Sequence, residues 1–140
     1  MKILRFTFEN KKLLDQAFLL RTKVFIEEQK VDSALEFENE EEAIHYLLFV
    51  GKKAVATGRW RQTPNGIKLE RFVTLKNYRA KGYGLMLLQH ILTEVIPLNQ
   101  PIYLHAQISA LGFYKRNGFS ESGKPFDEAG IAHYLMFFRP

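Results

Sequence analysis

The 140-residue chain contains no cysteine. This absence excludes disulfide bonds, thiolate metal ligands and a cysteine nucleophile, and it is compatible with a reducing compartment. No apolar run exceeds five residues, the length of YLLFV at residues 46–50, which is far shorter than the roughly 20 residues that a membrane-spanning helix needs. The N-terminal segment MKILRFTFEN has too few apolar residues for a secretory signal. We therefore expect a cytoplasmic protein that does not enter a membrane.

The sequence also lacks an excess of acidic side chains. It has 20 Lys and Arg residues against 15 Asp and Glu residues, which gives a formal net charge of +5 and an isoelectric point near 9.5. A basic chain favours anionic partners; a nucleic acid, a phosphorylated cofactor and an acidic surface are candidates, and charge alone does not choose among them. The length and the 46% apolar composition suit one domain over residues 1–140.

Hydrophobic periodicity predicts an α+β fold. Strands are expected over residues 2–8, 45–62 (a hairpin around GKK), 67–75, 101–107 and 131–138. The expected element order is β-α-(β-β-β)-α-β-α-β. It combines an antiparallel meander with one helical crossover between neighbouring strands, so the fold class is α+β with a mixed α/β character.

Three helices separate these strands. The first is capped by Asn10 and ends near Gln29, the second begins at a pair of glycines and stops at Pro97, and the third is capped by Ser109. The second helix is expected to bury Leu88, Ile91, Leu92 and Val95. The segment 120–130 is expected to be a loop, and so is the acidic stretch 32–43. If its residues 36–42 faced a binding cleft they would favour a cationic amine, but a solvated loop is the preferred interpretation.

Two glycines stand at the first turn of the second helix, in the segment LKNYRAKGYGLMLLQHIL at residues 75–92. Glycine in a helix costs about 1 kcal/mol relative to alanine, so the pair needs a reason. The first turn of a helix offers unpaired N–H groups and partial positive charge, and a pyrophosphate can approach them when side chains are absent. Gly82 and Gly84 meet that need, and Arg79 and Lys81 add charge. The alternative is that the glycines serve only a tight turn and close helix–sheet packing.

Two familiar phosphate-binding motifs do not fit. A P-loop needs Lys and then Ser or Thr after its last glycine, but Gly84 is followed by Leu85. The dinucleotide fingerprint needs a third glycine where this chain has Leu87.

The segment LERFVTLKNYRAKGYGLMLLQHIL, followed by YLHAQISALGFYKRNGF, resembles the acetyl-CoA signature of the GNAT (general control N-acetyltransferase) superfamily. Residues 79–84 match its R/Q-x-x-G-x-G/A motif, and residues 110–119 match its A-x-x-F-Y-x-x-x-G-F pattern. The pieces LRTKVFIEEQKV, GRWR and GIAHYLM further resemble the ElaA-like branch of small acetyltransferases. The resemblance spans essentially the whole chain. It implies a GNAT-type fold with a central mixed, mostly antiparallel sheet of about six to seven strands and helices on both faces.

The resemblance implies an N-acetyltransferase that moves an acetyl group from acetyl-CoA to a primary amine, by direct attack in a ternary complex and without a metal. A backbone amide of residue 72 or 73 would polarise the thioester carbonyl, and the turn at 79–84 would hold the pyrophosphate. The expected cofactor-binding residues are Phe72, Val73, Thr74, Leu75, Arg79, Ala80, Lys81, Gly82, Tyr83, Gly84, Gln107 and Tyr114.

Tyr114 and Glu70 are the expected catalytic residues. The resemblance places Tyr114 beside the cofactor sulfur, where a phenol can protonate the departing thiolate; the alternative is a packing role. Glu70 lies on the strand before the phosphate turn, where the superfamily often carries a glutamate that deprotonates the amine through water. Glu70 could instead be a structural partner of Arg59, Arg61 or Arg71, and a carboxylate among arginines is a weak base because its pKa is lowered.

The four histidines stand singly, and none forms an H-x-x-x-H or H-E-x-x-H pair, so no metal site is expected. His45 and His105, on strands near the implied cleft, are further candidates for the base or for a substrate contact. A buried, hydrogen-bonded structural role is the alternative for each.

Two other functional classes stay open. A non-catalytic acyl-CoA-binding or regulatory module would keep the glycines and the basic rim but would not need Tyr114. A nucleic-acid-binding domain is supported only by the isoelectric point, and no recognition motif accompanies it, so no nucleic-acid partner is expected. The sequence does not name the amine acceptor, and the resemblance also admits a homodimer.

Overall fold

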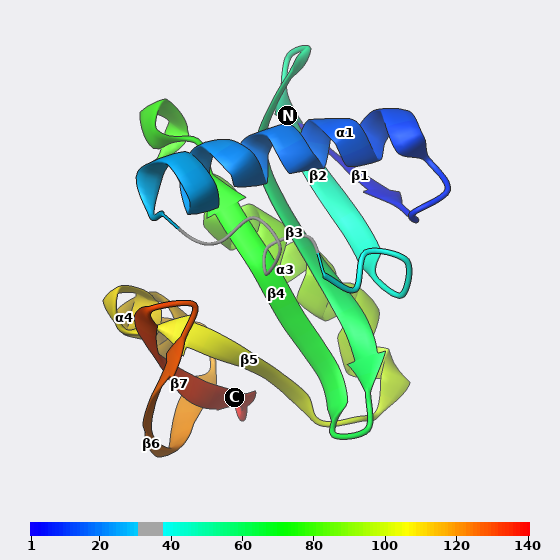
Figure 1. Cartoon of the computed structure of the whole chain (residues 1–140). Helices are drawn as coiled ribbons and strands as arrows, with labels where there is room; N and C mark the ends of the chain where they lie inside the picture. Colours follow the sequence, from blue (N-terminus) through cyan, green and yellow to red (C-terminus); the bar gives the residue numbers. More distant parts are fainter. Residues whose placement is uncertain (31–37) are drawn as a thin grey trace.

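A central mixed sheet of seven strands organises the protein (Figure 1). The computed structural model describes residues 1–30 and 38–140. The strand order is β1-β2-β3-β4-β5-β7-β6, and every neighbouring pair is antiparallel except β4 and β5. The strands are β1 (Lys2–Phe6), β2 (Ile44–Val50), β3 (Lys53–Thr63), β4 (Gly66–Thr74), β5 (Ile102–Gln107), β6 (Phe119–Glu128) and β7 (Ile131–Phe138).

The helices are α1 (Lys11–Arg21), α3 (Tyr83–Val95) and α4 (Leu111–Arg116). A π-helical segment, η1 (Thr22–Glu28), continues α1, and short 3-10 turns form η2 (Lys76–Tyr78), η3 (Ile96–Leu98) and η4 (Ile108–Ala110). As predicted, the sheet is mixed and mostly antiparallel, and α1 and α3 cover its opposite faces (Figure 1).

Helix α1 covers one face of the sheet. It begins where the sequence predicts, because Asn10 Oδ1 accepts a hydrogen bond from the backbone N–H of Leu13 at 3.2 Å and so satisfies one of the first free amides. The helix buries its apolar stripe, including Leu14 and Ala17, in a cluster that also contains Leu47 of β2.

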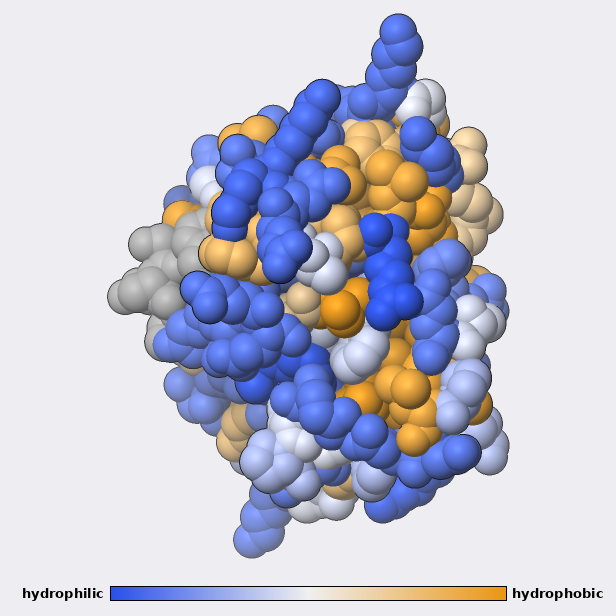
Figure 2. All heavy atoms as spheres, turned by 90° about the vertical axis from the view of Figure 1, so that its right-hand side faces the viewer, coloured by the Kyte–Doolittle hydropathy of each residue, from blue (hydrophilic) through white to orange (hydrophobic). Residues whose placement is uncertain are grey.

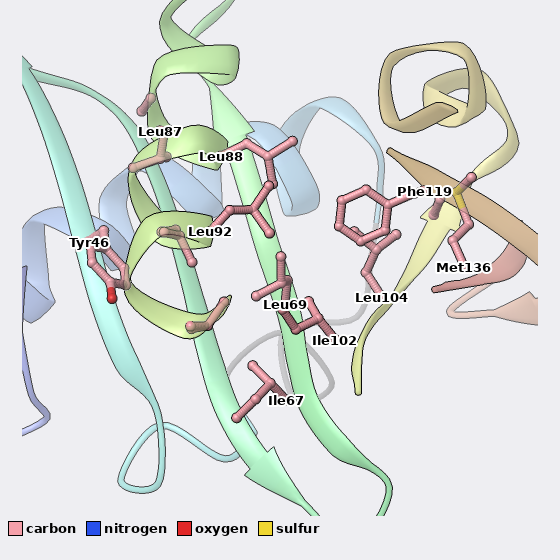
Figure 3. Packing of buried hydrophobic residues seen from close by; sticks show 14 of the residues in the cluster. Tyr46, Ile67, Leu69, Leu87, Leu88, Leu92, Ile102, Leu104, Phe119 and Met136 are labelled. Atoms are coloured by element: carbon pink, nitrogen blue, oxygen red, sulfur yellow. The ribbon is translucent and has the colours of Figure 1, made fainter. Parts of the chain in front are cut away.

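Helix α3 covers the other face. Its predicted core residues Leu88, Ile91, Leu92 and Val95 are all buried. Figure 3 shows leucines of α3 directed at the side chains of β4, among them Leu69. Residues 75–82, which include the turn η2, connect β4 to α3. The start of α3 lies beside the end of β4, since a Cβ atom on Gly84 would be 3.7 Å from Thr74 Oγ1.

Strands β4 and β5 separate from each other after a short parallel contact. They pair only from Ile67 with Ile102 to Leu69 with Leu104. Strand β5 then continues beside β7 as far as Gln107, so it follows β7 away from β4. The predicted helical crossover between these two strands is confirmed, since α3 connects them.

Strand β4 carries a bulge just beyond this separation. Thr57 of β3 faces Val73 and Arg59 faces Glu70, so Gly58 faces two residues, Arg71 and Phe72. Arg71 has a left-handed backbone with φ of 61°. A Cβ atom on Gly58 would lie 2.8 Å from the Phe72 ring, so only glycine lets this ring lie across β3. The bulge interrupts the regular ladder at Phe72, and the family resemblance implies that the backbone amide of Phe72 or Val73 polarises the thioester carbonyl.

Two local predictions are wrong. The segment 120–130 is mostly strand β6 rather than a loop. It is an edge strand with many exposed polar residues, and its register with β7 shifts between Ser122 and Phe126, so no alternation marks it. Ser109 does not cap α4; it lies inside η4, and Ala110 takes the cap position.

None of the helices in the described part of the chain is long and apolar enough to cross a membrane. Figure 2, which views the side at the right of Figure 1, shows hydrophobic residues gathered mainly toward the right of the view and hydrophilic residues over most of its left. The homodimer stays a prediction.

Candidate active site

A cavity of about 170 Å³ opens where β4 and β5 separate. Side chains of β4, β5, β7, α4 and the end of the α1–η1 helix line it. Four predicted site residues meet there, namely Glu70, Phe72, Gln107 and Tyr114. The other predicted residues, at 73–75 and 79–84, lie outside the lining of this cavity; the side chain of Val73 packs in the α1-side core.

Tyr114 reaches the cavity from α4. Its ring makes edge contacts with Phe113 and Phe119, with centroids 5.2 Å and 5.7 Å away. Burial raises the pKa of the Tyr114 hydroxyl, so the phenol keeps its proton at neutral pH and can donate it. Packing and a donor role are therefore compatible at this position.

The glycine turn is open and uncapped. Gly82 has φ of 85° and Ala80 has φ of 62°, so two residues of the turn are left-handed. The first helical hydrogen bond runs from Met86 N–H to the Gly82 carbonyl at 3.0 Å, and no side chain of the described residues caps the preceding amides. A Cβ on Gly82 would meet nothing within 4 Å, and one on Gly84 only Thr74 Oγ1 at 3.7 Å. Close helix–sheet packing therefore does not explain the glycines, whereas the turn conformation does require Gly82.

Arg79, predicted at the rim of this turn, is tied to η1. Both terminal nitrogens of its guanidinium donate to the Glu28 carboxylate at 3.0 Å, and its Nε donates to the Thr74 carbonyl at 2.9 Å. The Arg79–Glu28 pair is exposed, so an incoming phosphate can compete with the carboxylate for the same guanidinium.

Glu70 is surrounded by cations. Arg59 Nε and Arg61 Nε donate to its Oε1 at 3.0 Å and 2.7 Å, and Lys68 Nζ lies 3.4 Å from Oε2. Burial alone raises the pKa of this carboxyl, but the charges, that of Arg59 above all, outweigh it and lower the pKa to about 2. Glu70 is thus an ion-pair partner of Arg59 and Arg61, as the second of the two predicted alternatives has it, and its carboxylate is a weak base.

The prediction of a solvated acidic loop is wrong at Glu40, while residues 32–37 lie outside the described part of the chain. Glu40 is 7% exposed and binds the guanidinium groups of Arg21 and Arg59. His45 is 1% exposed and donates from Nε2 to the Glu40 carbonyl at 3.0 Å. Burial lowers the pKa of His45, which has the predicted structural role and does not line the cavity.

Several cavity residues carry no signal in the sequence. Gln29, the residue after η1, exchanges two amide hydrogen bonds with Gln107, at 2.9 Å and 3.4 Å, across the opening between the strands. Glu128 and His133 also line the cavity. Only their spatial proximity marks them, because they come from two different strands. His105, predicted as a further candidate for the base or for a substrate contact, lines the cavity beside them. Among the described residues, no group of three or more His, Cys, Asp or Glu side chains is arranged to hold a metal ion.

Comparisons with known proteins agree on one family. The family model described as "Acetyltransferase (GNAT) domain" matches residues 9–139. Two Bacillus subtilis proteins are similar along most of their length. The "Uncharacterized N-acetyltransferase YjcF" is 35% identical over 91% of this chain and 94% of its own, and the "Uncharacterized protein YyaT" is 38% identical over 97% and 94%.

Solved structures share the fold. Escherichia coli ElaA superposes with a TM-score of 0.89 over all of both chains at 21% identity. An aminoglycoside 6′-N-acetyltransferase complexed with coenzyme A superposes with a TM-score of 0.78 over 100% of this chain and 98% of that one, at 19% identity. The GNAT-type fold predicted from the resemblance is therefore confirmed.

These matches, together with the split sheet, define an acyltransferase enzyme. The chain belongs to the GNAT acetyltransferase family, whose members use an acyl-CoA as cosubstrate, and it shares the fold of ElaA.

Proposed function

We propose that this protein is an N-acetyltransferase that moves an acetyl group from acetyl-CoA to a primary amine by direct attack in a ternary complex. The observation that carries the proposal is the cavity at the separation of β4 and β5, which brings Tyr114 and the bulged segment at Phe72 together. We also propose that residues 1–140 act as a single acetyltransferase domain, because one sheet joins both ends of the chain.

The turn at residues 79–84 fits the pyrophosphate of acetyl-CoA. Its amides at the start of α3 have no side-chain cap among the described residues, the space beside Gly82 is open, and Lys81 adds positive charge. Thr74 and Leu75 lead from the bulge to this turn, so a cofactor lying along them would extend from the turn toward the cavity. The complex of the aminoglycoside acetyltransferase with coenzyme A supports this ligand class.

The cavity residues fit the chemistry of acyl transfer from a thioester. The lone pair of a neutral amine attacks the carbonyl carbon, and a backbone amide of Phe72 or Val73 stabilises the oxyanion. As the C–S bond breaks, Tyr114 gives its proton to the thiolate, and the proton that the attacking nitrogen loses returns to the Tyr114 oxygen through water. Gln107 contacts the cofactor or the acceptor. Glu70 orients the amine through a water molecule; its low pKa makes it suited to an amine that is already neutral.

The test is calorimetric binding of acetyl-CoA, free CoA and 3′-dephospho-CoA to the wild type and three variants. Gly82→Glu places a carboxylate in the open space of the turn and is expected to abolish binding. Gly82→Ala introduces the same backbone strain as Gly82→Glu but no charge, and its Kd for acetyl-CoA is expected to stay within a few-fold of the wild-type value. Gly123→Glu repeats the same change at a left-handed glycine with open space on β6, away from the cavity, and is expected to bind normally.

Absence of binding to the wild type would refute the acetyltransferase proposal. Binding that Gly82→Glu leaves intact would move the pyrophosphate away from residues 79–84. Binding without transfer to any amine would favour the non-catalytic module. The acceptor, a small molecule or a protein amine, is then sought by screening amines with the wild type.

A further inference from the structure

His105 stands at the first position where β5 is free of β4. The last pair of the parallel ladder joins Leu69 to Leu104, so Glu70 and His105 are the next residue on each strand. Side chains alternate between the faces of a sheet, and Leu69 and Leu104 belong to the core under α3. Glu70 and His105 therefore share the opposite face, and both line the cavity.

A carboxylate binds one of the two ring nitrogens of His105. Its Nδ1 lies 2.9 Å from Glu128 Oε1, and the ring edge meets Phe126 with centroids 5.0 Å apart. The hydrogen bond from His105 lowers the pKa of Glu128, so the carboxylate is ionised and accepts a hydrogen bond from the Nδ1–H group. Within the described chain, Nε2 of His105 has no hydrogen-bond partner.

Glu128 is itself fixed in place. His133 Nε2 lies 3.7 Å from its second oxygen, and His133 Nδ1 donates to the Ile131 carbonyl at 2.7 Å. The pair is thus a histidine oriented by a carboxylate, the arrangement in which the free ring nitrogen carries a lone pair. His105 remains 26% exposed, so an amine can reach it from the cavity.

The wild-type reaction needs a stronger base than Glu70 when the acceptor amine is protonated. An alkylammonium ion must lose a proton before it can attack, and a carboxylate paired with several cations takes up protons poorly. An imidazole is a better match to this task near neutral pH.

We propose that His105 is the general base of the transfer and that Glu128 is its positioning residue. The proposal rests on the proposed acetyltransferase function. Nε2 takes one proton from the ammonium group, and the neutral amine forms the C–N bond while the C–S bond breaks. Tyr114 protonates the thiolate, and the second proton of the amine nitrogen returns to the Tyr114 oxygen through water. His105 then releases its proton to solvent, so each turnover yields one amide, one CoA thiol and one proton.

Other titratable groups surround His105 and enter its pH dependence. They are Lys68, Glu70 and Arg71 on β4, Tyr103 on β5, Tyr114 on α4, Glu128 on β6 and His133 on β7. The end of the α1–η1 helix lines the cavity with Val24, Phe25 and Gln29, none of which titrates.

The first arm of the test reads the ring directly. In the full-length wild type bound to CoA, ¹⁵N NMR of the histidine rings, assigned with His105→Gln, reports which nitrogen carries the proton. The neutral ring of His105 is expected to hold its proton on Nδ1 and to leave Nε2 bare. A neutral ring protonated on Nε2 would overturn the proposal, whether or not an acceptor is known.

The second arm measures acetyl transfer from acetyl-CoA to three protonated amines, spermidine, kanamycin and Nα-acetyl-lysine, and to hydroxylamine, which is already neutral at pH 7. His105→Gln is expected to lower kcat/KM for a protonated amine by about 10²- to 10³-fold, as for removal of a general base. It should change the hydroxylamine rate by only a few-fold and leave acetyl-CoA affinity unchanged. The variant can use only the fraction of the amine that is already neutral, so its kcat/KM for a protonated amine should still rise with pH, and its deficit against the wild type should be largest at low pH.

Matched variants separate catalysis from structure. Glu128→Ala is expected to reduce kcat/KM for the protonated amine, and Glu128→Gln, which can still accept the Nδ1 proton, should restore part of it. His90→Asn removes a histidine that makes a similar pair with Glu94, at 3.1 Å on α3 away from the cavity, and should leave activity unchanged.

The outcomes of this test differ from failure of the acetyltransferase itself. A wild type that binds no acetyl-CoA refutes the proposed function. If the wild type and the His105→Gln variant acetylate an amine equally well and with the same pH profile, that result refutes only the role of His105. If the wild type acetylates none of the three amines, the NMR measurement of the His105 ring tests the proposal. A neutral ring without a proton on Nε2 supports His105 as the base, and a neutral ring with a proton on Nε2 contradicts it.

Discussion

Tyr114 owes its proposed role to its surroundings as much as to its hydroxyl group. Edge contacts from Phe113 and Phe119 hold the ring at the cavity, and burial raises its pKa. A phenylalanine would keep these ring contacts and lose only the proton donor, so this residue can be tested without disturbing the core.

Tyr114→Phe is expected to lower kcat by about 10²-fold, within the range for loss of a general acid, while the Kd for acetyl-CoA stays within two-fold of the wild-type value. The check is steady-state kinetics beside calorimetry. Tyr134→Phe on β7, outside the cavity lining, is the control. A Tyr114→Phe variant with wild-type kcat would leave packing as the function of this tyrosine.

Under the proposed function, Glu28 competes with the cofactor phosphate for Arg79. Glu28→Gln frees the guanidinium, and because an exposed ion pair contributes at most about 1 kcal/mol, CoA binding is expected to tighten by about two- to five-fold. Calorimetry measures the change, and Glu9→Gln, an exposed residue before α1, controls for net charge. Weaker binding in Glu28→Gln would show that Glu28 positions Arg79 for the phosphate instead of blocking it.

At the scale of the element, the bulge in β4 depends on one small residue of β3. Gly58→Ala would place a Cβ atom 2.8 Å from the Phe72 ring, so the ring or the strand has to shift. We expect a loss of about 1–3 kcal/mol in the free energy of unfolding, as for overpacked cores, and weaker acetyl-CoA binding.

Urea denaturation and calorimetry check this prediction. Gly84→Ala is the stability control, because its Cβ meets only Thr74 Oγ1 at 3.7 Å and the residue lies inside α3, where alanine is the better helix former. A stable Gly58→Ala protein with normal binding would mean that the bulge tolerates a side chain on β3.

The elements differ in how far their sequences specify them. α1 and α3 were predictable because their apolar residues recur at helical spacing and because Asn10 and Gly82 mark where the helices begin. β6 was not predictable, since its polar residues face solvent along an edge and only the hydrogen bonds to β7 make it a strand. The cap of α4 was misplaced by one residue because the short turn η4 precedes it.

At the scale of the whole molecule, a network of buried charges joins α1, the described part of the acidic stretch, β3 and β4. Glu40 bridges Arg21 and Arg59, and Arg59 in turn binds Glu70. Such a network makes folding sensitive to acid, because its carboxylates must stay ionised.

The stability of the fold is therefore expected to fall in acid. The pKa of Glu70 is about 2 in the fold against 4.5 for the free side chain, so its contribution is present above about pH 4.5 and is lost as the pH falls toward 2. The loss is on the order of 3 kcal/mol. Urea midpoints measured from pH 7 to pH 2 report it. Glu70→Gln should be less stable at pH 7 and should lose less on acidification; an equal acid loss in both proteins would contradict the assignment.

The sequence was sufficient to predict the family and the fold class, and it marked the glycine turn that we propose for the pyrophosphate. These features depend on local patterns, namely apolar periodicity, the spacing of Gly82 and Gly84, and two motifs in order along the chain. The positions of the cavity and of its acid–base groups required the folded chain. His105, Glu128 and Gln29 are distant in sequence and meet only where β4 and β5 separate, and Glu70 loses its strength as a base only when folding buries it beside Arg59 and Arg61. Side-chain chemistry of this kind arises from long-range contacts, which no local pattern encodes.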